Sequence, residues 1–165
     1  MDTLRDAKRL VGQLADHSLR LVLAESCTGG MVSAELAKVP GVSQWFCGSA
    51  VTYREATKTS WLAVDTSAIA QHTAVSAVVA SQMAAGVLER TPEADIAASV
   101  TGHFGPSAPP GFDGLAFIAT ARREGESVDI EVQRHRLDAT DRSARQREAT
   151  HRVLAALSGR IDSLQ

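Results

Sequence analysis

The feature that most constrains the fold is an apolar run that ends in a polar, glycine-containing turn and continues as a helical pattern. Residues 19–24 (LRLVLA) are β-prone, and residues 25–30 (ESCTGG) are polar. Residues 31–39 (MVSAELAKV) then place their apolar side chains at helical spacing. A strand, a polar turn and a helix in this order form the basic unit of an α/β fold. We therefore expect a sheet that is covered by helices.

The rest of the chain continues this alternation. Further strands are predicted for residues 47–53, 95–100, 114–121 and 127–137, and helices for residues 3–16, 54–62 and 75–90, with a last helix of about 20 residues from Thr140. Ser76 is the expected N-cap of the 75–90 helix. Residues 127–137 alternate apolar and polar side chains, which is typical of an antiparallel edge strand. These patterns predict an α/β fold with one domain over residues 1–165, a three-layer α/β/α sandwich with a mixed sheet.

Composition excludes several classes of protein. The chain has 165 residues, of which 44% are apolar, and this suits one domain with a sizeable core. A formal net charge of −2 gives no electrostatic reason to expect nucleic acid or a membrane surface as a partner. No apolar run is long enough for a transmembrane helix, and residues 1–14 lack the apolar stretch of a secretory signal. Cys27 and Cys47 are therefore expected to be reduced thiols in a cytoplasmic protein.

The polar turn is the first place that could carry chemistry, because α/β proteins bind ligands at the carboxyl ends of their strands. Ser26, Cys27 and Thr28 offer nucleophiles or hydrogen-bond donors. Gly29 and Gly30 allow a ligand to approach the backbone, whose free amides could bind a phosphate or an oxyanion. The alternative is that a serine or threonine here only caps the following helix.

Lys58 is the second such place. It is one of three lysines, and the other two, Lys8 and Lys38, belong to amphipathic helix patterns. The simplest interpretation is a solvated surface lysine, since lysine is rarely buried. If the side chain is instead partly buried, desolvation lowers its pKa and makes the amine a usable base. Such a base could activate a serine, as Ser–Lys pairs do.

The third place is the Gly- and Pro-rich loop at residues 101–111. Thr101 follows a predicted buried strand, and Gly102 and Gly105 permit a positive φ or a close approach to the backbone. The loop is either a plain connection or one wall of a pocket. Neither a nucleophile elbow, nor a Walker loop, nor a metal-ligand spacing of His and Cys is present, so that no metal and no cofactor is expected.

Together, these places resemble the C-terminal domain of the CinA family (competence/damage-inducible proteins), which includes nicotinamide mononucleotide deamidases of the PncC type. The motifs that carry the resemblance are AESCTGG at residues 24–30, Val51-Thr52-Tyr53 with Lys58 five residues later, QHTAVS at residues 71–76, Thr101-Gly102 with Gly105-Pro106, and Asp141-Arg142 at the start of the last helix. The resemblance covers most of the chain. It agrees with an α/β sandwich.

The resemblance implies a metal-independent hydrolysis of nicotinamide mononucleotide to nicotinic acid mononucleotide and ammonia. Ser26 would then be the nucleophile and Lys58 its base. Tyr53 and Thr101 would support the pair through hydrogen bonds, and Arg142 is the expected ligand-binding cation. The resemblance also implies a homo-oligomer that acts on a small-molecule nucleotide and not on a nucleic acid.

One segment departs from the family pattern. The family loop usually reads Thr/Ser-Gly-Ile-Ala-Gly-Pro, whereas His103 and Phe104 stand at its third and fourth positions here. A pocket that this loop lines would differ in volume and polarity. The expected substrate-binding residues are Thr28, Gly29, Gly30, Gly102, His103, Gly105 and Arg142. Three alternatives stay open: a Ser–Lys hydrolase of another small amide, a nucleotide-binding module without catalysis, and Cys27 as the nucleophile.

Overall fold

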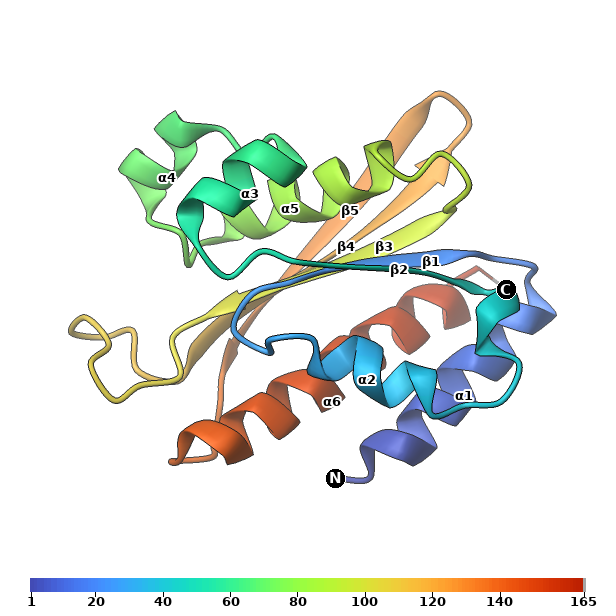
Figure 1. The fold of residues 1–165 in the computed structure, drawn as a ribbon, viewed down its shortest axis with the longest axis horizontal. Helices are drawn as coiled ribbons and strands as arrows, with labels where there is room; N and C mark the ends of the chain where they lie inside the picture. Colours follow the sequence, from blue (N-terminus) through green and yellow to red (C-terminus); the bar gives the residue numbers. More distant parts are fainter. Residues whose placement is uncertain (165) are drawn as a thin grey trace.

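The computed structural model describes residues 1–164 and shows a five-stranded sheet between two layers of helices (Figure 1). The strands are β1 (Leu21–Glu25), β2 (Phe46–Val51), β3 (Ile96–Gly102), β4 (Leu115–Glu124) and β5 (Ser127–Arg136). The helices are α1 (Thr3–Asp16), α2 (Met31–Ala37), α3 (Glu55–Leu62), α4 (Thr66–His72), α5 (Ala77–Glu89) and α6 (Arg142–Asp162), with a 3-10 turn at Val42–Gln44. The predicted three-layer sandwich is confirmed.

The order of the strands in the sheet is β2-β1-β3-β4-β5. β1 is parallel to both β2 and β3, whereas β4 is antiparallel to β3 and to β5, so the sheet is mixed as predicted. At the carboxyl end of β1, Glu25 lies opposite Val51 of β2 and Val100 of β3. The polar segments that follow these three strands therefore meet at one edge of the sheet.

β1, an inner strand of the sheet, packs against helices on both of its faces. Leu21 and Leu23 contribute to the core under α1, α2 and α6, and Val22 and Ala24 contribute to the core under α5 (Figure 1). All five residues of β1 are buried. A strand covered on both faces needs apolar side chains at nearly every position, which explains the continuous apolar run in the sequence.

The predicted strands and long helices are all present, with bounds that differ by a few residues. Ser76 caps α5 as expected, because its Oγ accepts the Val79 amide at 3.3 Å. No sequence pattern predicts α4, a seven-residue helix whose single buried residue, Ala68, leaves it without an apolar stripe. Among the described residues, no helix has both the length and the apolar composition that crossing a membrane requires.

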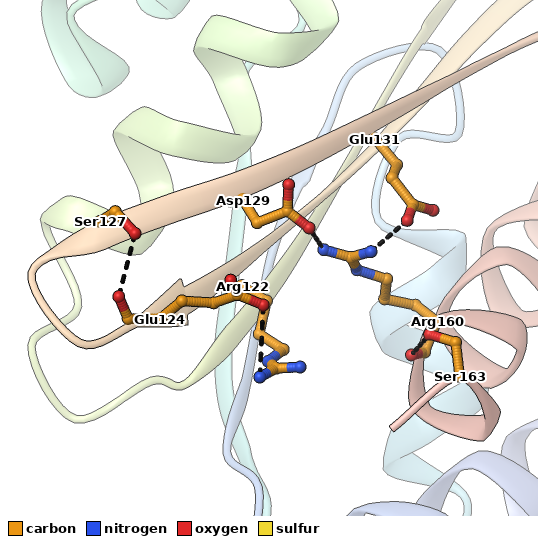
Figure 2. Close-up of polar contacts among 7 residues, drawn as sticks. All are labelled: Arg122, Glu124, Ser127, Asp129, Glu131, Arg160 and Ser163. Carbon is orange, nitrogen blue, oxygen red and sulfur yellow. Dashed lines mark hydrogen bonds and ion pairs between the residues drawn. The ribbon is translucent and has the colours of Figure 1, made fainter. Parts of the chain in front are cut away.

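β5 is the antiparallel edge strand that its alternation predicts. Ile130 packs against the core under α5, while Asp129 and Glu131 point to the opposite face. Figure 2 shows the guanidinium of Arg160, near the end of α6, between these two carboxylates, and it forms an ion pair with each of them. This cluster fastens the last turns of α6 to the edge of the sheet.

Candidate active site

A cavity of about 380 Å³ lies where the carboxyl ends of the parallel strands meet. Its walls come from the turn after β1, the segment after β2, α3, the segment before α5, the loop after β3 and the start of α6. The residues that the sequence singled out and that line it are Ser26, Cys27, Tyr53, Lys58, Thr101, Gly102, His103, Phe104, Gly105 and Arg142. The volume falls in the range of small-molecule sites.

Ser26 and Lys58 form a hydrogen-bonded pair on the wall of this cavity. Lys58 Nζ lies 2.8 Å from Ser26 Oγ and donates a second hydrogen bond, of 2.7 Å, to the Thr52 carbonyl. Lys58 is 2% exposed and Ser26 is 7% exposed. Because the Thr52 carbonyl takes one N–H of the amine, the lone pair of a neutral Lys58 can accept the Ser26 hydroxyl.

The surroundings of Lys58 make its amine a base. Burial lowers the pKa of Lys58 from 10.5 to about 8, against the smaller opposing effects of Cys27 and Glu55. No carboxylate within residues 1–164 forms an ion pair with the ammonium. A base with a pKa close to the working pH is suited to take a proton from a hydroxyl and return it.

Cys27, the neighbour of Ser26, also lines the cavity, but its chemistry is different. Burial raises the pKa of the Cys27 thiol from 9.0 to about 12. The thiol is therefore protonated at neutral pH, whereas nucleophilic attack by sulfur requires the thiolate. The arrangement thus favours Ser26 over Cys27 as the nucleophile.

The amides at the start of α2 are occupied by the protein itself. Glu25, which is 1% exposed, accepts five hydrogen bonds through its carboxylate. The donors are Thr28 Oγ1 at 2.8 Å, the amides of Gly30, Val32 and Ser33 at 3.1, 3.0 and 3.0 Å, and Ser49 Oγ at 3.1 Å. The sequence assigned no role to Glu25, although it immediately precedes Ser26.

Thr28, Gly29 and Gly30 do not line the cavity, unlike the other expected substrate-binding residues. The Gly30 amide donates to Glu25 and the Gly29 amide donates to the Ser26 carbonyl at 3.0 Å. Both glycines have a positive φ, which is 62° at Gly29 and 96° at Gly30. The structure therefore corrects the expectation that these two amides are free for a phosphate or an oxyanion, because both hold the turn in shape.

Tyr53 and Thr101 lie at the cavity without bonding to the pair. Thr101 Oγ1 donates to the Ala74 carbonyl at 2.8 Å and so fixes the wall formed by the segment before α5. The Tyr53 hydroxyl accepts a hydrogen bond from the guanidinium of Arg142. The implied hydrogen bonds from these two side chains to Ser26 or Lys58 are thus replaced by bonds to the walls of the cavity.

Arg142 supplies the positive charge at the rim of the cavity. Besides Tyr53, its guanidinium bonds to the Gly105 carbonyl at 2.7 Å, and no carboxylate in the described part of the chain pairs with it. It is also the first residue of α6, where the helix dipole is positive. A guanidinium without a carboxylate partner in this position suits an anionic group such as a phosphate.

The two residues that depart from the family pattern behave differently. Phe104 is 3% exposed and belongs to the core under α1, α2 and α6. The His103 ring packs edge-on against Phe112, with the ring centres 5.6 Å apart, and accepts or donates no hydrogen bond among residues 1–164. Burial lowers the pKa of His103, so the imidazole that lines the cavity is neutral at pH 7.

Two residues that sequence reasoning missed hold the loop after β3. Arg145 of α6 binds Asp113 through two hydrogen bonds of 2.7 Å. Gly105 packs against this pair with φ +71°, and a Cβ there would lie 2.9 Å from Asp113 Oδ1. A Cβ at Gly102 would lie 2.9 Å from the Leu115 carbonyl, so the absence of a side chain here allows β3 to approach β4. Neither contact has a local sequence signal.

No group of three or more His, Cys, Asp and Glu side chains in the part of the chain that the structure describes could hold a metal ion. The chemical groups that the cavity does gather are a hydroxyl, a buried amine, a guanidinium and a neutral imidazole. The hydroxyl and the amine are in contact, and the guanidinium stands at the rim. Such a set is suited to acyl transfer from an anionic substrate.

Comparison with known proteins finds relatives in sequence and in structure. A model of the CinA C-terminal domain matches residues 4–161. A CinA-like protein of Akkermansia muciniphila is 37% identical over 152 residues, which cover 91% of this chain and 36% of that protein. The crystal structure of competence damage-inducible protein A from Klebsiella pneumoniae subsp. pneumoniae MGH 78578 is similar over 100% of both chains, with a TM-score of 0.92 and 29% identity. A CinA superfamily protein from Klebsiella pneumoniae 700603 is similar over 99% of both chains, with a TM-score of 0.91 and 30% identity.

The curated relatives are longer than the matched segment. The chain spans between 22% and 36% of the length of these proteins. The two solved structures match in full, so the likeness to them includes the strands and helices around the cavity.

Proposed function

The chain belongs to the CinA C-terminal domain family, and on this premise we propose that it hydrolyses nicotinamide mononucleotide to nicotinic acid mononucleotide and ammonia. The proposal rests above all on one observation, the 2.8 Å contact between Ser26 Oγ and a buried Lys58 Nζ in a cavity of substrate size. The reaction needs no metal in this scheme. Its base is the neutral amine of Lys58.

In the first half of the reaction, Lys58 Nζ takes the proton of Ser26 as Oγ attacks the carboxamide carbon. The resulting tetrahedral intermediate carries a negative charge on the former carbonyl oxygen. Lys58 then gives its proton to the carboxamide nitrogen, the C–N bond breaks and ammonia leaves. The nicotinoyl group remains as an ester on Ser26.

In the second half, water attacks the ester carbon and transfers a proton to Lys58. The ester C–O bond breaks, Lys58 returns the proton to Ser26 Oγ, and nicotinic acid mononucleotide leaves with a new carboxyl group. Throughout, the Thr52 carbonyl holds the amine in place through its hydrogen bond of 2.7 Å. The covalent route suits a primary carboxamide because it divides one difficult step into two easier ones.

The rim of the cavity supports a nucleotide as the substrate. Arg142 has no carboxylate partner among the described residues and can bind a phosphate through two parallel hydrogen bonds. Tyr53, which is 53% exposed, lies beside it and offers an aromatic ring at the entrance. The anionic end of the substrate would thus sit at the start of α6, with its amide at Ser26.

Replacing Ser26 with alanine tests the proposal. Ser26→Ala removes the nucleophile, so ammonia release should fall by more than about 1000-fold. Ser60→Ala is the matched control, since Ser60 is an exposed serine on α3, the helix that carries Lys58. Both variants should unfold at the wild-type temperature. Full activity of Ser26→Ala would end the proposal.

His103 favours a second candidate function, the hydrolysis of another small amide by the same pair. Its neutral imidazole lines the cavity without a hydrogen-bond partner among residues 1–164, so it can bind a polar group of the substrate. Assays of a panel of primary amides beside nicotinamide mononucleotide separate the two candidates. If calorimetry shows that the nucleotide binds but no ammonia is released over hours, the chain is a binding module.

A further inference from the structure

The carboxylate of Glu25 is buried without a counter-ion. It is 1% exposed, and no Lys, Arg or His in the described chain lies within ion-pair distance of it. Its charge is instead stabilised by the five hydrogen bonds given above. A buried carboxylate is tolerated only where such donors replace water. These donors come from the turn, α2 and β2, so one side chain joins three segments.

The side chain of Glu25 fixes the turn that presents Ser26. Two of its donors, Thr28 and Gly30, belong to this turn. The Ser26 amide also donates to the Val100 carbonyl of β3 at 3.1 Å, so the nucleophile is held from both sides. With the turn locked at these points, Ser26 Oγ has a fixed direction.

The main chain of Glu25 reaches the other member of the pair. Its carbonyl accepts the Thr52 amide at 2.8 Å, and the carbonyl of Thr52 accepts Lys58 Nζ at 2.7 Å. The carboxylate strengthens the same connection, because Ser49 Oγ on β2 donates to it three residues before Thr52. Glu25 is thus bonded to the supports of both Ser26 and Lys58.

We propose that Glu25 is a positioning residue, which sets the geometry of the Ser26–Lys58 pair for the amidase reaction proposed above. Capping α2 alone would not require it, because this helix has seven residues and an exposed serine or aspartate caps a helix as well. Glu25 is buried between the turn, α2 and β2, so its side chain does more than cap the start of a helix: it also connects that helix to β2. It makes the distance from hydroxyl to amine independent of the motions of any one of these segments.

The variant Glu25→Gln tests this role, because it keeps the size of the side chain but places an NH₂ group against backbone N–H donors. The turn must shift to relieve this clash, and a displacement of about 1 Å costs about 100-fold in rate. We expect labelling of Ser26 by a fluorophosphonate probe to slow by about 10- to 100-fold. With nicotinamide mononucleotide, kcat should fall by the same factor while KM stays near the wild-type value.

The matched control is Glu35→Gln. Glu35 is a carboxylate on α2 that pairs only with the surface residue Lys38 at 2.7 Å, so its variant should react at the wild-type rate. If Glu25→Gln does not fold, Thr28→Val and Ser49→Ala take its place. Each of them removes one of the five donors and should slow the labelling by a smaller factor than the loss of the carboxylate.

A purely structural role predicts another result, namely a lower unfolding temperature with an unchanged labelling rate of the folded protein. That result for Glu25→Gln, or wild-type rates in both Thr28→Val and Ser49→Ala, would overturn the proposal. The probe also separates this proposal from the amidase itself. If the wild-type protein is labelled but releases no ammonia, only the proposed substrate is refuted. If Ser26 of the wild-type protein is never labelled, both the amidase proposal and the positioning role of Glu25 are refuted.

Discussion

Lys58 can serve as the base of the proposed reaction because the fold keeps water away from its amine. Burial lowers the pKa of Lys58 to about 8, whereas the same lysine in the unfolded chain has an ordinary pKa of 10.5. Between these two values the unfolded chain binds more protons than the folded protein does. Lys58 therefore makes the free energy of unfolding increase with pH across this window, and the full cost of burying the ammonium is present below it.

The same pKa predicts how the activity depends on pH. Only the neutral amine can take the proton of Ser26, so kcat/KM for ammonia release should increase with pH and reach a plateau above a pH of about 8. Initial rates measured across the neutral and mildly alkaline range check this. Lys58→Arg should be inactive at every pH, because a guanidinium does not lose its proton. A wild-type profile that is flat through this range would contradict the assignment of Lys58 as the base.

Residue chemistry could be predicted from the sequence better than residue contacts. Ser26 and Lys58 are 32 positions apart, and only the resemblance to a family connects them. Hydroxyl directions have no sequence signal, so Thr101 was expected to support the pair and instead holds the Ala74 carbonyl. Glu25 was missed because the sequence does not show that its side chain folds back onto the turn and the start of α2, where four of its five donors lie, and because the fifth donor, Ser49, comes from β2.

Among the elements, α3 carries Lys58 and its position depends on a glycine of α5. Gly86 faces the carbonyl of Leu62, the last residue of α3, and a Cβ at this position would lie only 1.9 Å from that oxygen. No side chain fits there unless one helix moves. The absence of a side chain at Gly86 therefore determines how closely α3 and α5 pack, and with it where Lys58 stands.

Gly86→Ala should therefore destabilise the protein and also reduce its activity. We expect a loss of about 1–3 kcal/mol from the forced separation of the two helices. The matched control is Gly12→Ala in α1, where a Cβ meets nothing within 4 Å. That change should stabilise the protein by about 0.5–1 kcal/mol, since alanine loses less backbone entropy than glycine on folding. Denaturant unfolding measures both changes, and wild-type stability of Gly86→Ala would contradict this account.

The success of the sequence patterns depended on the length of the element. α5 and β5 have enough residues for a periodic pattern, and both were predicted. α4 is short and buries only Ala68, so its sequence shows no helical stripe. The last helix begins at Arg142 instead of Thr140, because Asp141 is the cap and its carboxylate accepts the Ala144 amide at 2.9 Å.

Across the whole molecule, α6 connects the cavity to the far edge of the sheet. Its 21 residues extend for about 31 Å. Arg142 stands at the cavity, while Arg160 lies near the other end and pairs with Asp129 and Glu131 at the edge of the sheet (Figure 2). The order of the strands, which places β5 at the edge of the sheet beside the end of α6, could not be predicted from local patterns, because no single segment specifies its neighbours.

Arg160→Gln should lower stability without changing catalysis. Asp129 and Glu131 are about half exposed, so water can solvate them once the guanidinium is gone, and we expect a loss of about 1–2 kcal/mol. Ammonia release per folded molecule should equal that of the wild type, because the cluster is a helix length away from the cavity. Arg147→Gln, at an exposed position of the same helix, is the control. A fall in kcat of folded Arg160→Gln would show that the two ends of α6 are coupled.

The placement of the reacting groups along the chain has one more consequence. The hydroxyl, the amine and the carbonyl that orients it all lie within residues 25–58, whereas His103 and Arg142, which line the cavity and would contact the rest of the substrate in the proposed reaction, come much later. If the proposed reaction holds, reactivity and choice of substrate thus depend on separate stretches of sequence. In such an enzyme, substitutions within residues 103–108 would change which amide the cavity accepts and leave Ser26, Thr52 and Lys58 untouched.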